Sequence, residues 1–162
     1  VGGANMVDLK KLRIEKKMTQ QEVADLVGIS LRSYKSYEND EEKQNTIKYN
    51  YIVEQLSKIN YIDEETGILE PEDIKRKCAK VFANHEVNFC YLFGSYAKGK
   101  ATPVSDVDLL ISANVKGLKF YGLVEEIRTA LHKKVDVLNM NQLKDNIELT
   151  EEILKDGIKI YG

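Results

Sequence analysis

The spacing of apolar residues changes part-way along this chain, and that change limits the folds open to it. From Leu9 to Ile59 apolar residues recur at helical spacing, whereas from Val87 onward runs of β-branched and aromatic residues alternate with helical segments. Between the two regions, residues 61–70 carry four acidic residues and no basic one. We therefore predict an all-α domain over 6–60, an acidic linker over 61–70 and an α/β (α+β) domain with a small mixed sheet over 71–162.

Composition narrows the class of protein. The 162 residues are 43% hydrophobic and 31% charged, with a formal net charge of −2, which is typical of a globular chain. We find no apolar run of the roughly 18 residues that a membrane helix needs, and no secretory signal, so we expect a cytoplasmic protein with no membrane partner. Cys78 and Cys90 lie 12 residues apart without a CxxC pair, which argues against a disulfide framework or a structural zinc site.

The first region predicts four short helices, over about 9–14, 20–27, 31–38 and 46–59. Thr19 and Glu22 have the spacing of a capping box, Gly28 ends the second helix, and Ser30 can cap the third. Two short helices joined by so tight a turn are typical of a helix-turn-helix, in which the second helix enters the DNA major groove.

The pattern Met18-Thr-Gln-Gln-Glu-Val-Ala, Gly28-Ile-Ser and Tyr37-Glu resembles the Xre/Cro-like helix-turn-helix family. The resemblance implies that Tyr34 and Tyr37 face the core. It places the DNA contacts on Gln20, Arg32, Ser33, Lys35 and Ser36. An arginine or serine can read a base edge, whereas a lysine suits a phosphate. The turn after the third helix, residues 39–42, is acidic where the family usually has a basic or glycine turn.

An alternative for this region is a helical interaction module without a nucleic-acid role. Residues 6–60 hold 10 Lys and Arg against 9 Asp and Glu, and a balance of +1 is weak for a DNA-binding protein. A homodimer would double the charge presented to the phosphates. If the partner is operator DNA, we therefore expect the protein to bind it as a homodimer.

The second region predicts helices at about 72–85, 118–131 and 143–156. The strands are expected at 87–93, 107–112 and 134–139, with a short edge strand at 158–161. Its chemistry is concentrated in Gly94-Ser95, Asp106-Val-Asp108 and Asp136. Carboxylates two residues apart on a strand point to the same face, and Mg²⁺ prefers such oxygen ligands together with substrate phosphates. Gly94-Ser95 after an apolar strand allows a tight turn whose backbone N–H groups can approach a triphosphate. Three carboxylates and such a turn predict a site for nucleotidyl transfer with two Mg²⁺ ions.

The segments Leu92-Phe-Gly-Ser-Tyr-Ala-Lys-Gly, Ser105-Asp-Val-Asp-Leu-Leu and Val135-Asp-Val-Leu resemble the minimal nucleotidyltransferases of the polymerase-β-like superfamily. The resemblance covers roughly residues 72–162. It implies that Gly94 and Ser95 bind nucleotide phosphates, and that Asp106 and Asp108 hold both metals. Asp136 would complete the first metal's shell or help to deprotonate the acceptor. Where the family often has arginine this chain has Tyr96 or Lys98, and Lys98 preserves a cation for the phosphates as a point charge.

Proteins similar to the second region commonly act as antitoxins, transferring AMP from ATP to a tyrosine of a HEPN-type ribonuclease toxin. A fused helix-turn-helix suits a repressor of the toxin–antitoxin operon. The resemblance thus implies an Mg²⁺-dependent enzyme with ATP, a HEPN-type toxin and operator DNA as partners. Two alternatives stay open: a non-catalytic transcription regulator that senses nucleotide, and a small-molecule nucleotidyltransferase.

Overall fold

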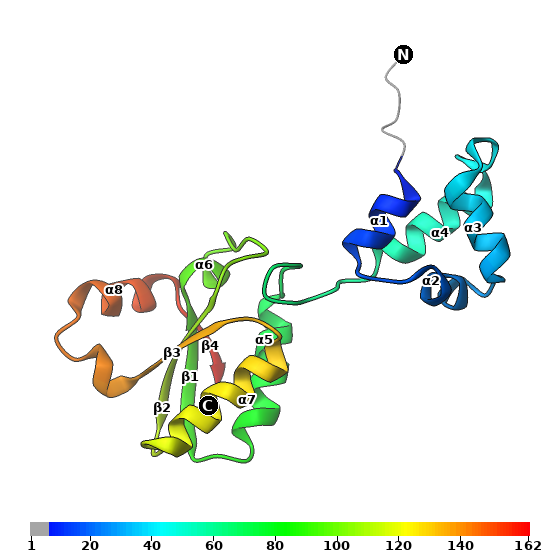
Figure 1. Ribbon diagram of the computed structural model, residues 1–162. Coiled ribbons are helices and arrows are strands. Elements are labelled where there is room, and N and C mark those ends of the chain that lie inside the picture. Colours follow the sequence, from blue (N-terminus) through cyan, green and yellow to red (C-terminus); the bar gives the residue numbers. More distant parts are fainter. Residues whose placement is uncertain (1–6) are drawn as a thin grey trace. The chain divides into compact units, whose positions relative to one another are not determined.

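The computed structural model describes residues 7–162, and the chain divides into two compact units, the first ending at Tyr61 and the second running from Ile62 to Gly162 (Figure 1). Met6, at which we began the helical domain, lies outside the described residues. No helix among residues 7–162 has the length and apolar character needed to cross a bilayer.

Within residues 7–61, the first unit is built from helices joined by turns and loops. It consists of α1 (Leu9–Glu15), α2 (Gln20–Val27), α3 (Leu31–Asn39), a 3₁₀ turn η1 (Glu41–Lys43) and α4 (Ile47–Ser57). The expected caps are present: Thr19 and Glu22 form a capping box, and the Ser30 side chain accepts a hydrogen bond from the backbone of Ser33. Gly28 ends α2 in the left-handed conformation at φ 71°, which glycine adopts without strain. The predicted helix-turn-helix is confirmed.

The second unit is built around one mixed sheet. Its elements are α5 (Pro71–Phe82), β1 (Val87–Phe93), α6 (Gly94–Ala97), β2 (Val107–Ala113), α7 (Leu118–Leu131), β3 (Val135–Asn139), η2 (Met140–Leu143), α8 (Ile147–Asp156) and β4 (Ile158–Tyr161). The strand order is β3-β2-β1-β4, with β2 and β3 parallel and β1 antiparallel to both of its neighbours. The predicted small mixed sheet is confirmed, with β4 as an edge strand.

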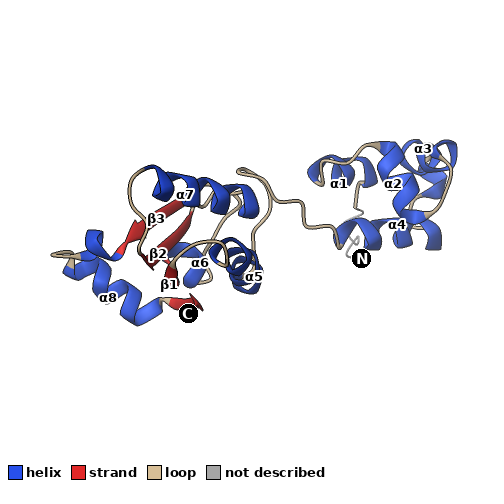
Figure 2. Ribbon diagram, turned by 90° about the horizontal axis from the view of Figure 1, so that it is seen from below, coloured by secondary structure: helices blue, strands red, loops and turns tan. Residues whose placement is uncertain are grey.

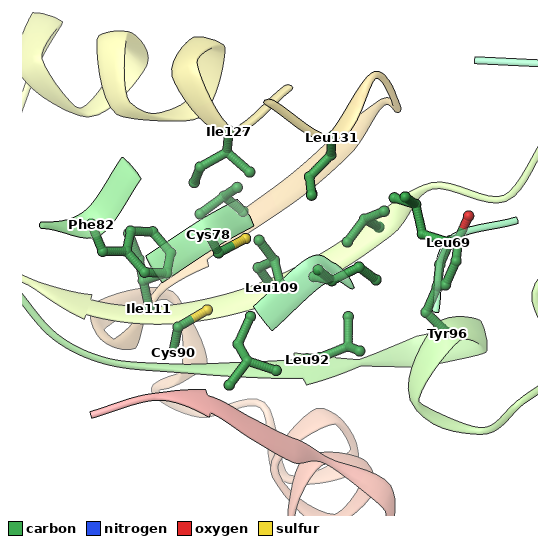
Figure 3. Packing of buried hydrophobic residues seen from close by; sticks show 14 of the residues in the cluster. Leu69, Cys78, Phe82, Cys90, Leu92, Tyr96, Leu109, Ile111, Ile127 and Leu131 are labelled. Atoms are coloured by element: carbon green, nitrogen blue, oxygen red, sulfur yellow. The ribbon is translucent and has the colours of Figure 1, made fainter. Parts of the chain in front are cut away.

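Helices cover both faces of this sheet. α5 and α7 pack together on one face, and α8 lies against the other, so the strands run between α7 and α8 in Figure 2. The larger core lies under α5 and α7, where Cys78 and Phe82 of α5 meet strand residues such as Cys90 and Leu109 (Figure 3). A smaller cluster under α8 contains Phe93, Leu110 and Ile153.

Two segments differ from the sequence expectation. We expected a helix from about Leu143, but α8 begins at Ile147 after a separate 3₁₀ turn, because Asn146 caps it and Asp145 adopts a left-handed conformation at φ 65°. We expected residues 61–70 to be a linker, yet from Ile62 onward they belong to the second unit. Leu69 is buried in its core, and Ile62 packs against that core.

Candidate functional site

The exposed face of α3 carries most of the side chains predicted to contact DNA. Arg32 and Lys35 are exposed and Ser33 is half-buried, while Tyr34 and Tyr37 point into the core as expected. The alternation follows from helical periodicity, since the two tyrosines lie one turn apart on the buried side. The face is therefore free to meet a partner, and its DNA contacts stay a prediction.

The other two predicted DNA contacts are engaged within the unit. The Gln20 amide donates a hydrogen bond to the Glu38 carboxylate at 2.8 Å. The Ser36 hydroxyl accepts one from Lys43 Nζ at 2.6 Å, and the same ammonium lies 5.0 Å from the centre of the Tyr37 ring. Lys43 thus brings a positive charge next to α3, immediately after the acidic turn at residues 39–42.

Asp108 and Asp136 lie side by side on the sheet. β2 and β3 are parallel, with Asp108 in register with Asp136. Side chains in register on neighbouring strands project from the same face. That face is the one opposite α5 and α7, because Val107 and Leu109, which flank Asp108, belong to the core beneath those helices.

Asp106 precedes β2 by one residue and is exposed, and its charge acts on Asp108. The structure therefore brings together the three carboxylates singled out from the sequence. Asp136 lies on the same face of the sheet as Asp108, as a shared site of three carboxylates requires.

The Gly94 turn lies directly against Asp108. Phe93, the last residue of β1, pairs with Asp108 across the antiparallel ladder, so the chain enters α6 beside that carboxylate. A Cβ atom on Gly94 would lie 2.1 Å from Asp108 Oδ2, and Gly94 has φ 71°. No other residue fits this position without displacing the carboxylate. Gly94 is therefore required both by the turn and by the contact with Asp108.

Negative charge accumulates around Asp108. Burial raises the pKa of Asp108, and the charges of Asp136, Asp106 and Glu152 raise it further, to about 6. A carboxyl whose charged form is disfavoured by its neighbours is typical of a site that receives a cation.

Glu152 is a part of the site that sequence reasoning missed. It lies on α8 and accepts a hydrogen bond from Lys98 Nζ at 2.8 Å, which joins α8 to the turn after α6. This ion pair raises the pKa of Lys98. In the sequence Glu152 is one of several glutamates on an amphipathic helix, and nothing local distinguishes it from Glu148 or Glu151.

The nucleotidyltransferase family often has arginine at the position of Tyr96 or Lys98. Of these two residues, only Lys98 is exposed to solvent. Tyr96 is buried beside Leu69 in the core of the second unit (Figure 3). Lys98 is exposed, at the C-terminal end of α6, but its ammonium is held by Glu152.

The donors at this site suit a hard divalent cation. Asp106, Asp108 and Asp136 offer carboxylate oxygens, and a bound cation would offset the repulsion that raises the pKa of Asp108. No cluster of three or more His, Cys, Asp or Glu residues within 7–162 is arranged to hold a metal ion as it stands. The residues fit Mg²⁺ by their chemistry.

Comparison with known families agrees with this geometry. A family model described as polymerase beta, nucleotidyltransferase, matches residues 76–162, which is more than half of the chain and includes Gly94, all three aspartates and Glu152. The chain belongs to the polymerase β-type nucleotidyltransferase family. A helix-turn-helix family model matches residues 9–46, which span α1 to η1. The protein is thus a nucleotidyltransferase with an N-terminal helix-turn-helix.

Three relatives of this nucleotidyltransferase come from Methanocaldococcus jannaschii, and each is named "putative protein adenylyltransferase". One is 37% identical over 91 residues, which cover 54% of this chain and 95% of the relative. A second is 32% identical over 77 residues, covering 46% of this chain and 90% of that relative.

Solved structures of similar fold include toxin–antitoxin complexes. One, described as a toxin–antitoxin with AMP-PNP, is 23% identical with a TM-score of 0.47, covering 54% of this chain and 73% of that one. Another is described as a tri-AMPylated Shewanella oneidensis HEPN toxin in complex with its MNT antitoxin. It is 20% identical with a TM-score of 0.42, covering 55% of this chain and 70% of the other. The family assignment rests on the family model and the relatives, not on these likenesses.

Proposed function

We propose that the second unit uses ATP and Mg²⁺ to transfer AMP to a hydroxyl of a partner protein. The observation that carries the proposal is the position of Asp108, in register with Asp136 and in contact with the Gly94 turn. Nucleotidyl transfer needs a phosphate-binding turn beside metal-binding carboxylates, and this arrangement supplies both within one face of the sheet. The names of the three archaeal relatives support a protein acceptor.

In this proposal each site residue has a defined task. Backbone N–H groups of Gly94 and Ser95 would bind the phosphates, and Asp106 and Asp108 would hold two Mg²⁺ ions. When bound, Mg²⁺ neutralises charge on the triphosphate and increases the acidity of the acceptor hydroxyl. Asp136 would be a further ligand of the first ion or would take the proton of the acceptor hydroxyl. The acceptor oxygen forms a bond to the α-phosphorus of ATP, and the bond from that phosphorus to pyrophosphate breaks.

Lys98 has two candidate partners in this proposal, the triphosphate and Glu152. Because its ammonium is already paired with Glu152, binding to phosphate requires Lys98 to leave that pair. Both side chains are partly open to solvent, so the exchange costs little, since solvent screens ion pairs between exposed side chains.

The acceptor is proposed to be a HEPN-type toxin, which makes the protein an antitoxin. Asp106 and Asp136 are exposed at the rim of the sheet, so an acceptor that approaches from solvent can reach them. A macromolecular acceptor would supply the opposite wall of the site. Complex formation and AMP transfer would then both silence the toxin.

The helix-turn-helix is proposed to bind the operator of the toxin–antitoxin operon as a homodimer, in the cytoplasm. Exposed Arg32 and Lys35 on α3 support contacts with bases and phosphates, and Lys43 adds charge beside them. Two copies are needed because the charge balance of one unit is close to neutral.

The enzymatic proposal is tested with labelled ATP, Mg²⁺ and the product of the neighbouring toxin gene. Wild-type protein should label the toxin, whereas Asp106→Asn, Asp108→Asn and Asp136→Asn should each lose at least about 100-fold in rate. Glu125→Gln, an exposed position on α7 on the opposite side of the sheet, is the matched control. Equal labelling by wild-type and the three aspartate variants would defeat the enzymatic proposal.

The DNA-binding proposal has its own test. A duplex carrying the operon's promoter should bind wild-type protein with an affinity that falls steeply with salt, and Arg32→Ala should weaken binding about 10-fold. Arg76→Ala, an exposed arginine on α5 in the second unit, should leave the affinity unchanged. If the affinity changed neither with salt nor in Arg32→Ala, the first unit would be a helical interaction module without a nucleic-acid role.

A further inference from the structure

Lys133 is a charged residue that lies completely buried. Its exposed fraction is 0%, and it is the polar or charged residue in the buried class among residues 7–162. Its ammonium donates three hydrogen bonds, to the carbonyl oxygens of Thr66 at 3.2 Å, Gly67 at 2.8 Å and Pro103 at 2.6 Å. A lysine ammonium has three donors, so all of them are used. Burial lowers the pKa of Lys133, and the charge of Asp63 opposes that effect.

The three carbonyl groups belong to two segments that are distant in sequence. Thr66 and Gly67 lie in the segment that begins the second unit, whereas Pro103 lies in the loop from α6 to β2. That loop ends at Asp106. A single side chain, placed at the entrance to β3, therefore holds both segments to the sheet.

The loop is attached to the same stretch of chain a second time. The backbone N–H of Val107 donates to the carbonyl oxygen of Lys134 at 2.9 Å. Asp106 thus lies between two attachment points, Pro103 and Val107, that are held by consecutive residues. Within the loop, the Ser105 hydroxyl accepts a hydrogen bond from the backbone of Thr102 at 2.9 Å, which closes the turn.

We propose that Lys133 is a positioning residue that fixes the loop carrying Asp106 and ties it to residues 62–67. Lys133 acts through backbone carbonyls and does not touch the reacting atoms. The catalytic importance of Asp106 rests on the proposed function above, whereas the fixing of the loop does not depend on it.

The chemistry of the pocket explains why a lysine occupies it. A methionine would fill a similar volume but remove the ammonium donor from three partly buried carbonyl oxygens, of which that of Thr66 keeps the backbone N–H of Asp63 at 3.0 Å. Losing these hydrogen bonds favours loop conformations in which water replaces the donor. An arginine keeps the charge, but its planar fork fits three converging carbonyl groups less well than a compact ammonium.

Amide hydrogen exchange on the full chain tests the proposal without any ligand. In Lys133→Met, amides of residues 62–67 and 99–106 should exchange at least about 10-fold faster, since the lost hydrogen bonds protect those segments. Lys133→Arg should show a smaller rise in the same segments. Lys134→Met, an exposed neighbour, should match wild-type protein.

The amides of β1 separate a local effect from general destabilisation. The proposal predicts that exchange rises more in 62–67 and 99–106 than in β1, for Lys133→Met or, if that variant does not fold, for Lys133→Arg. A rise of equal size in all three segments, or no rise in the loop, would overturn it.

Activity provides a second readout. With the toxin and ATP, Lys133→Met should lower kcat about 10-fold or more and change the KM for ATP less, because a misplaced Asp106 affects the reacting geometry more than nucleotide binding. If wild-type protein transfers no AMP, the proposed function fails, and hydrogen exchange alone still decides the role of Lys133.

Discussion

The two units each hold a carboxylate at the centre of a polar cluster, and the clusters are built in opposite ways. Glu38, whose side chain is 1% exposed, accepts hydrogen bonds from Arg13 at 2.5 Å, Gln20 at 2.8 Å and Tyr34 at 2.8 Å. Burial by itself raises the pKa of Glu38, but these hydrogen bonds outweigh it and lower the pKa. Around Asp108 burial and three negative charges act in the same direction and raise the pKa.

The difference separates a structural carboxylate from a functional one. Glu38 joins α1, α2 and α3, so its charge stabilises the first unit. Asp108 has like charges as neighbours, so its charge costs stability in the second unit unless a cation arrives. Charge that destabilises the free protein is expected where binding or catalysis uses it.

The largest effect is expected from Gly94→Ala, which disrupts the contact between the Gly94 turn and Asp108. The added Cβ would overlap Asp108 Oδ2, so the carboxylate or the turn must move. We expect AMP transfer to fall by about 100-fold or more, measured with labelled ATP and toxin. Gly122→Ala is the matched control, since a Cβ there meets nothing within 4 Å, and its activity should equal that of wild-type protein.

The Glu38 cluster can be broken with Arg13→Met. This change removes the cationic partner of a buried carboxylate, and such losses destabilise by about 3 kcal/mol. Hydrogen exchange of α3 amides in the full chain should report the loss within the first unit, with β1 unaffected. Arg32→Met, on the exposed face of α3, should leave the same amides protected; equal effects of the two variants would mean that Glu38 does not depend on Arg13.

The opposite sign is expected at Asp108. Asp108→Asn removes one of the crowded negative charges, so the second unit should become more stable by about 1 kcal/mol at pH 7, after allowance for screening by solvent. Urea unfolding in the absence of divalent cations measures this. A clear loss of stability would show that Asp108 serves the fold, as Glu38 does, and would remove the contrast between the two clusters.

The smallest expected effect is a loss of stability of the first unit in acid, which depends on Glu38. Because the folded-state pKa of Glu38 lies below its ordinary value of 4.5, the unfolded chain binds that proton more tightly. The stabilisation is complete above pH 4.5 and is lost as the pH falls through the folded-state pKa. Unfolding of the first unit, followed by α3 exchange, should show this acid loss, and Glu38→Gln should flatten the profile.

Local patterns predicted much of this molecule because they are encoded by neighbouring residues. Sequence patterns predicted the capping box of Thr19 and Glu22 and the strand from Val87 to Phe93. They also singled out Asp108 as a site residue. Asp136 was found because an acid between valines on a strand is unusual.

Contacts between distant segments could not be predicted in the same way. Glu38 reaches Arg13 across 25 positions, Glu152 reaches Lys98 across 54, and Lys133 reaches Thr66 across 67. Each is an ordinary charged residue in its own stretch of sequence. The packing of helices and strands decides which partner each of them meets. The spacing of residues along the sequence gives no information on that packing. The same holds for residues 62–70, whose acidic composition predicts a linker although Leu69 is buried.

Both cysteines of the chain, Cys78 and Cys90, lie in the core of the second unit. Burial raises the pKa of the Cys78 thiol to about 12 and raises that of Cys90 as well, so neither forms the reactive thiolate while the fold is closed. An alkylating reagent would therefore label the chain only when this unit opens, and the first unit has no thiol to confuse the signal. The rate of labelling, followed by mass spectrometry, would therefore measure how fast the second unit opens, independently of the first unit.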